Sequence, residues 1–129
     1  MGDTPNTRVV TMLYVGDVTR ARDFYRDVLD REPTMDAGSY AEFTWGNLVL
    51  GLRARDNAVR QFAGRVASSP GPVAQQITVE VTDPDGLLAR ARAHGAELVQ
   101  PPTDQPWGMR SAAFLDPDGH LVEVCAPLA

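Results

Sequence analysis

Polar side chains that could hold a ligand recur at alternate positions in two short stretches of the sequence. Gln76, Thr78 and Glu80 alternate with apolar residues, and Glu123 lies between two valines. Alternation with a period of two predicts half-buried β-strands, so the polar side chains of a stretch share the face that points away from the core. Glu80 and Glu123 could pair with a cationic group of a ligand, and Arg110 with an anionic group. A salt bridge or a solvated charge is an equally good interpretation of all three.

The same alternation in the first half of the chain predicts a second sheet face that points away from the core. The residues expected to point away from the core are Val10, Met12 and Tyr14 in one strand and Asn47, Val49, Gly51 and Arg53 in another. The residues expected to point into the core are Leu13 and Val15 in the first strand and Leu48, Leu50 and Leu52 in the second. A curved sheet with a concave face of mixed polar and aromatic side chains is typical of a ligand cleft, and a solvated sheet face is the alternative.

The strands and helices that carry these residues are expected in the same order twice. In the first module, 8–54, the expected elements are a strand over 9–15, a helix capped by Asp17 with the apolar stripe Val18, Ala21, Tyr25, Val28 and Leu29, and strands over 34–36, 40–45 and 48–53. In the second module, 73–127, they are a strand over 75–81, a helix capped by Asp83 with the stripe Leu87, Leu88 and Ala91 and a stop at His94-Gly95, and strands over 97–100, 109–115 and 121–126. The spacing therefore predicts an α+β domain of two βαβββ modules.

The two modules match along their length at an offset of 66 residues, which places Val10 opposite Gln76. An internal repeat of this length indicates a repeated fold unit. Residues 55–72 between the modules contain Ser68-Ser69-Pro70-Gly71-Pro72 and predict a linker, with a short helix near 58–64.

Composition narrows the classes of function. A chain of 129 residues with 43% hydrophobic and 22% charged residues predicts one ordinary globular domain. The net charge of -5 disfavours nucleic acid as a partner. No apolar stretch reaches the roughly 20 residues that span a bilayer, and 1–8 lack a signal-peptide core, so a cytoplasmic protein is expected. The single cysteine, Cys125, fits a reducing compartment, and a buried apolar role for it is favoured over a reactive thiol.

Three stretches of the sequence resemble one known superfamily. They are Val15-Gly16-Asp17 with the helix ending Asp23–Leu29, then Pro106-Trp107-Gly108, then Phe114–Val124 with its central Asp116-Pro117-Asp118-Gly119 turn. Together they resemble the vicinal-oxygen-chelate superfamily of glyoxalases, bleomycin-resistance proteins and dioxygenases. The resemblance implies paired βαβββ modules and a homodimer.

The resemblance also implies where metal-dependent members of this superfamily hold their ion. Carried onto this chain, the four ligand positions fall on Val10, Gly51, Gln76 and Glu123. Val10 and Gly51 offer no donor, Gln76 is a weak ligand, and only Glu123 is a strong one. No metal and no other cofactor is therefore expected, and no catalytic residue is assigned.

Aromatic side chains are the expected ligand contacts. Trp107 lies in a Pro-Trp-Gly loop that resembles those of drug-binding resistance proteins, and a local packing role for this side chain is the alternative. Tyr14, Tyr40 and Trp45 are further candidates, with Met12, Gln76, Glu123 and Arg110 completing the expected set. The facing of the strand over 40–45 is left open.

These observations favour a binding protein over an enzyme. The leading hypothesis is a metal-free homodimer that sequesters an aromatic antibiotic or a related small molecule. The alternative is a metal-dependent lyase, isomerase or dioxygenase of the same superfamily, and a ligand sensor is a third interpretation.

Overall fold

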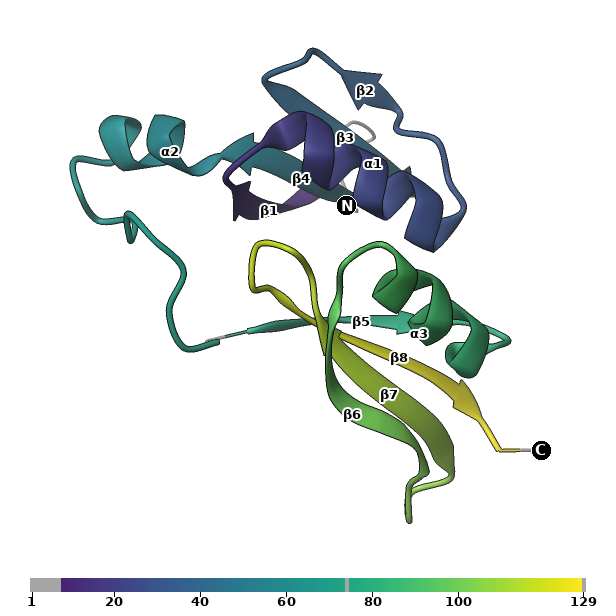
Figure 1. Ribbon diagram of the computed structural model, residues 1–129. Helices are drawn as coiled ribbons and strands as arrows, with labels where there is room; N and C mark the ends of the chain where they lie inside the picture. The colour runs from purple at the N-terminus through teal and green to yellow at the C-terminus, as the bar shows by residue number, and fades with distance from the viewer. Residues whose placement is uncertain (1–7, 74, 129) are drawn as a thin grey trace, which may run out of the picture. The chain divides into compact units, whose positions relative to one another are not determined.

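A computed structural model describes residues 8–73 and 75–128, which fall into two compact units (Figure 1). Unit 1 comprises 8–26 and 30–69, and unit 2 comprises 27–29 together with the described residues from 70 onward. The elements of the first module are β1 (Val9–Val15), α1 (Val18–Leu29), β2 (Met35–Asp36), β3 (Tyr40–Trp45) and β4 (Leu48–Ala54), followed by α2 (Arg55–Gln61). Those of the second are β5 (Gln76–Glu80), α3 (Pro84–Ala93), β6 (Glu97–Asp104), β7 (Met109–Leu115) and β8 (Leu121–Pro127).

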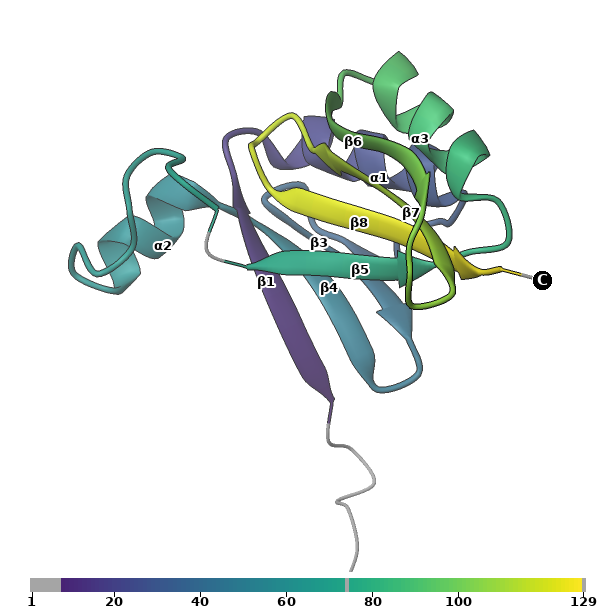
Figure 2. The same ribbon diagram turned by 90° about the horizontal axis from the view of Figure 1, so that it is seen from below.

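Each module builds a four-stranded mixed sheet with the same connectivity. The strand orders are β1-β4-β3-β2 and β5-β8-β7-β6. In each sheet the first strand pairs in parallel with the last, and the remaining pairs are antiparallel (Figure 2). The predicted α+β class and the twofold βαβββ order are confirmed. Among the described helices none is long and apolar enough to cross a membrane.

The two long helices begin at the predicted capping residues. The side chain of Asp17 accepts a hydrogen bond from Arg20 N, and that of Asp83 accepts one from Gly86 N. Each carboxylate satisfies a backbone donor that the first turn of a helix leaves without an intrahelical partner. The helix α3 ends at Ala93 with His94 as its C-cap, and Gly95 follows with a φ of 99°, a conformation that glycine adopts without strain.

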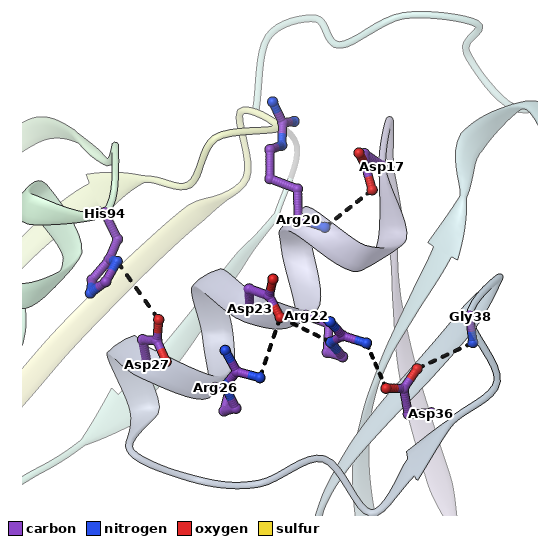
Figure 3. A network of polar contacts seen from close by, with 9 residues as sticks. All are labelled: Asp17, Arg20, Arg22, Asp23, Arg26, Asp27, Asp36, Gly38 and His94. Carbon is purple, nitrogen blue, oxygen red and sulfur yellow. Dashed lines mark hydrogen bonds and ion pairs between the residues drawn. The ribbon is translucent and has the colours of Figure 1, made fainter.

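In unit 1, α1 covers one face of the sheet. Arg22 of α1 donates to Asp36 of β2 over 2.6 Å, and Asp36 is paired in the sheet with buried Ala41 (Figure 3). The side chains at Asp36 and Ala41 therefore point to the helix, as do those of the same row in β3 and β4. The buried core on this side comprises Leu13, Val15, Ala41, Phe43, Leu50 and Leu52 of the sheet with Val18, Ala21, Phe24 and Tyr25 of α1.

Unit 2 has the corresponding core. It comprises Leu87, Leu88 and Ala91 of α3 with Ala112, Phe114, Val122 and Val124 of the sheet. Ile77 and Val79, the apolar residues that alternate with Gln76, Thr78 and Glu80, are only half-buried because β5 is the edge strand of its sheet. Cys125 is buried as predicted.

Several expected boundaries and one core assignment are corrected. Leu48 lies at the first position of β4 and is 51% exposed, so Leu50 and Leu52 are the buried residues of the helix-side row of β4. The strand β6 continues past Gln100 through two prolines to Asp104, which an edge strand with register shifts tolerates. The helix in the linker begins at Arg55, immediately after β4, and ends at Gln61.

Candidate functional site

Strand pairing defines one face of unit 1 that points away from α1, called here open face 1. In register across β1, β4 and β3, its residues are Val10, Met12, Tyr14, Val49, Gly51, Arg53, Tyr40, Glu42 and Thr44. The predicted facing of β1 and of Gly51 in β4 agrees with this register. The name refers to the side of the sheet without a helix of this unit, because Val49 and Glu42 on this face are buried.

The centre of open face 1 is Gly51, over which three side chains converge. A Cβ atom added at Gly51 would lie 2.7 Å from Met12 Sδ, 2.8 Å from Tyr40 Oη and 3.2 Å from Val10 Cγ1. Real Cβ atoms essentially never approach other atoms below 3.0 Å. The missing side chain of Gly51 therefore allows the thioether and the phenol oxygen to approach the backbone of β4 closely.

Beside Gly51 lies a buried carboxylate that the sequence interpretation did not assign to the site. Glu42 pairs with Gly51 across the sheet, is 6% exposed, and accepts a hydrogen bond from Tyr40 Oη over 2.7 Å. The guanidinium of Arg8 donates to both carboxylate oxygens, over 3.0 Å and 3.4 Å. A buried carboxylate needs such donors because burial without them disfavours its charge.

These contacts set the protonation states of the cluster. The hydrogen bonds from Arg8 and then from Tyr40 hold the pKa of Glu42 below its usual value. Burial, followed by the hydrogen bond to Glu42, raises the pKa of Tyr40 to about 12. At neutral pH the cluster therefore holds a carboxylate, a neutral phenol and a guanidinium.

The helix α2 contacts one end of open face 1. Arg53 donates to the side-chain oxygens of Asn57 and Gln61 in α2, and its guanidinium lies 5.3 Å from the ring centre of Phe62. Arg55 donates to the carbonyl oxygen of half-buried Tyr14 over 3.4 Å. The segment that was expected to be a linker thus packs against β1 and β4.

Unit 2 has a corresponding face, open face 2. Its residues are Gln76, Thr78 and Glu80 of β5, Leu121, Glu123 and Cys125 of β8, and Ser111, Ala113 and Leu115 of β7. Glu123 Oε1 accepts hydrogen bonds from Gln76 Nε2 over 3.1 Å and from Thr78 Oγ1 over 3.3 Å. Burial, with the negative charges of Glu80 and Glu123 adding to it, raises the pKa of the Cys125 thiol.

The two open faces are equivalent in register but differ in chemistry at two corresponding positions. Gly51 pairs with Met12 as Glu123 pairs with Thr78, and Met12 precedes Thr78 by the repeat offset of 66 residues. The positions that offer an amide and a carboxylate in unit 2 are therefore held in unit 1 by the hydrocarbon of Val10 and by a glycine.

The donor set does not fit a divalent metal. Such an ion needs at least three strong donors of the His, Cys, Asp or Glu kind, and these four positions supply one. Within 8–73 and 75–128, no group of three such side chains is placed to hold an ion. The space at Gly51 is moreover filled by Met12, Tyr40 and Val10.

Two of the expected ligand contacts lie on the helix side of their sheets. Trp45 shares the row of Phe43, and the guanidinium of Arg31 stacks 4.7 Å from its ring centre. Arg110 donates to Asp85 of α3 and to Asp104, which raises its pKa further and occupies the guanidinium. Neither Trp45 nor Arg110 lies on an open face.

Trp107 lies in the turn between β6 and β7 and is 68% exposed, so its side chain does not pack within its own loop. The base of this turn is fixed by Gln105, whose backbone N–H donates to Met109 O and whose side chain donates to Ser111 Oγ over 3.0 Å. An indole held in a fixed turn and left in solvent is available for stacking.

Comparison with known proteins places the chain in a family. The model of the glyoxalase/bleomycin resistance protein/dioxygenase superfamily matches residues 8–124. The chain belongs to this superfamily. It is 26% identical to the phenazine antibiotic resistance protein EhpR of Enterobacter agglomerans, over 95% of this chain and 91% of that one.

Solved structures agree with the fold. A glyoxalase-related enzyme from Fulvimarina pelagi superposes with a TM-score of 0.83 at 24% identity, over 94% of this chain and 88% of that one. A lactoylglutathione lyase from Agrobacterium tumefaciens superposes with a TM-score of 0.67 at 27% identity, over 95% of each chain. The superfamily thus includes both resistance proteins and enzymes. The side chains of the site must therefore be used to choose between these two functions for this chain.

Proposed function

We propose that this protein binds and sequesters a flat aromatic antibiotic or a related small molecule without a metal ion and without turning it over. Its similarity to EhpR supports a resistance role. The observation that carries the proposal is the packing over Gly51. Where a ligand to a metal would project, unit 1 presents a thioether, a phenol and a hydrocarbon side chain against a bare backbone.

The proposed contacts are Met12, Tyr14 and Tyr40 on open face 1, Gln76 and Glu123 on open face 2, and Trp107 in its exposed turn. A thioether and aromatic rings bind a planar ring system through dispersion and stacking, which contribute roughly 0.5–1.5 kcal/mol for each ring pair beyond the area buried. A dissociation constant near 1 μM, about 8 kcal/mol, is a reasonable scale for such a site.

Titration with unsubstituted phenazine and a panel of planar tricyclic aromatic compounds tests the proposal. We expect at least one compound to raise the thermal unfolding midpoint by mass action and to be recovered chemically unchanged. Met12→Ala should weaken binding about 5- to 30-fold, because three heavy atoms of apolar contact are removed. Trp45→Phe, on the helix side, is the matched control and should leave the affinity unchanged. A panel without any binder contradicts the proposal.

The second candidate function is a glyoxalase-type enzyme, which the similarity to a lactoylglutathione lyase favours. It predicts turnover of the methylglyoxal–glutathione adduct that increases when Ni²⁺ or Zn²⁺ is added. The donor set at Val10, Gly51, Gln76 and Glu123 opposes this function, since it lacks three strong ligands. Stoichiometric metal in protein purified without chelators, together with such turnover, would decide for the enzyme.

The homodimer and the cytoplasmic location remain predictions. Light scattering coupled to size-exclusion chromatography gives the mass in solution, and 14.0 kDa would indicate a monomer. Repeating the measurement with bound phenazine shows whether the ligand changes the assembly.

A further inference from the structure

The least expected feature of open face 1 is the ion pair between Glu42 and Arg8. The carboxylate side chain is 8% exposed and the guanidinium side chain is 50% exposed. One partner is therefore fixed in the sheet, and the other reaches it from the solvent side. Arg8 immediately precedes β1 and occupies the same alternating row as Val10 and Met12.

The two partners also differ in what else holds them. Glu42 keeps a second hydrogen bond, from Tyr40, and Tyr40 is itself packed over Gly51. The contacts of Arg8 within the described residues include this pair, whose two distances of 3.0 Å and 3.4 Å correspond to a fork of two parallel N–H bonds on one carboxylate. Removing Arg8 would leave the carboxylate in place, oriented by the phenol, with its charge unpaired.

The surrounding surface matches a planar cation. Glu42 pairs across the sheet with Gly51, over which the apolar or aromatic side chains of Met12, Val10 and Tyr40 converge. The other cation on this face, Arg53, is engaged by Asn57 and Gln61 of α2. Glu42 is the only carboxylate in the register rows that define open face 1.

We infer that Arg8 occupies the position of a cationic group of the ligand, and that Glu42 selects flat aromatic compounds carrying an amidinium, guanidinium or protonated amino group. The incoming cation displaces the half-exposed arginine and forms the same paired hydrogen bonds with the carboxylate. This inference rests on the proposed function and adds the charge class of its ligand. Neutral aromatic compounds either leave Arg8 in place or leave Glu42 unpaired, and anionic ones are repelled.

A pair of isosteric probes isolates the charge. 2-Naphthamidine carries an amidinium cation, whereas 2-naphthamide has the same ring and nearly the same shape without the charge. We expect the natural protein to bind the amidine about 10- to 100-fold more tightly than the amide, which is the range for hydrogen bonds to a charged group. Calorimetric titration at one pH and ionic strength gives both constants.

Two substitutions assign this preference to Glu42. In Glu42→Gln, which keeps the volume and can still accept from Tyr40, the two probes should bind within about threefold of each other. The matched control is Glu32→Gln, the same change at an exposed loop position, which should keep the full preference. A preference that survives Glu42→Gln in a folded protein overturns the inference.

The substitution Arg8→Gln provides a second test, and it leaves the buried carboxylate of Glu42 unaltered. Removal of the competing guanidinium should tighten amidine binding about 3- to 10-fold and change amide binding little. If Arg8→Gln weakens the amidine, Arg8 is a ligand contact and the inference is wrong.

The failures of the two proposals are distinguishable. If phenazine binds while the amidine and the amide bind equally, the charge selection is wrong and the proposed function stands. If phenazine, the tricyclic panel and both naphthalene probes all fail to bind, both are wrong.

Discussion

The packing over Gly51 makes a prediction that does not depend on the ligand. Replacing Gly51 by alanine puts a methyl group 2.8 Å from Tyr40 Oη and 2.7 Å from Met12 Sδ. Ordinary van der Waals contact begins near 3.4 Å, so the phenol oxygen must move by about 0.6 Å. Met12 can turn its flexible thioether away, but Tyr40 is bound to Glu42 through a hydrogen bond of 2.7 Å.

The expected cost follows from these two contacts. Overpacking by one methyl group costs about 1–3 kcal/mol, and weakening a hydrogen bond to a buried charge costs a share of its roughly 1.5–3 kcal/mol. We therefore expect Gly51→Ala to lower the free energy of unfolding by about 2–3 kcal/mol. For a domain of this size the thermal midpoint should fall by about 5–12 °C.

Urea unfolding of Gly51→Ala in two backgrounds measures this cost and its cause. In Tyr40→Phe, which lacks the hydroxyl, the same substitution should cost only about 1 kcal/mol. The control is Gly71→Ala, since a Cβ added at Gly71 meets nothing within 4 Å, and it should change the stability by less than about 0.5 kcal/mol. A Gly51→Ala loss below about 0.5 kcal/mol, or an equal loss in both backgrounds, refutes the described packing.

Three further predictions concern the core, the buried carboxylate and the exposed indole. Leu50→Ala should cost about 2–5 kcal/mol in the free energy of unfolding, whereas Leu48→Ala, on the same row but half exposed, should cost less than about 1 kcal/mol. The pKa of Glu42 is lowered by folding, so its stabilising effect is complete above the unfolded-state value near 4.5 and is lost as the pH falls through the folded-state value. Glu42→Gln should therefore reduce the loss of unfolding free energy at low pH, as measured by urea unfolding at pH 2–7. An unchanged dependence on pH would contradict the ion pair. Trp107→Ala should abolish ligand-induced quenching of tryptophan fluorescence without lowering the thermal midpoint by more than a few degrees, and an unchanged ligand affinity would remove Trp107 from the site.

Local patterns predicted most of the fold. Asp17 and Asp83 were identified as caps because capping depends on residues within one turn, and the stripes of both helices follow from spacing alone. The facing of β1 and of Gly51 followed from alternation. The sheet end at Leu48 was predicted wrongly, because alternation gives the side on which a residue lies and not whether a helix reaches that far.

Pairing over long sequence separations was not predictable in the same way. The strand β3 alternates Tyr40 and Glu42 with Phe43 and Trp45, so both of its faces include an aromatic residue, and only its register with β4 places Trp45 on the helix side of the sheet. The ion pairs of Arg110 could not be predicted, because its partners Asp85 and Asp104 lie in other elements. Glu42 was missed because Arg8, its counterion, is 34 residues away.

The occupied space at Gly51 restricts how this chain can change. A histidine or glutamate introduced there meets Tyr40 and Met12 before it reaches any ion, so a metal donor at this position requires further substitutions of those neighbours. Each intermediate protein would carry the packing cost without yet having a complete coordination sphere. The packing around Gly51 thus opposes the introduction of a metal-ligating side chain. A single substitution at this position would not convert the protein to a metalloenzyme.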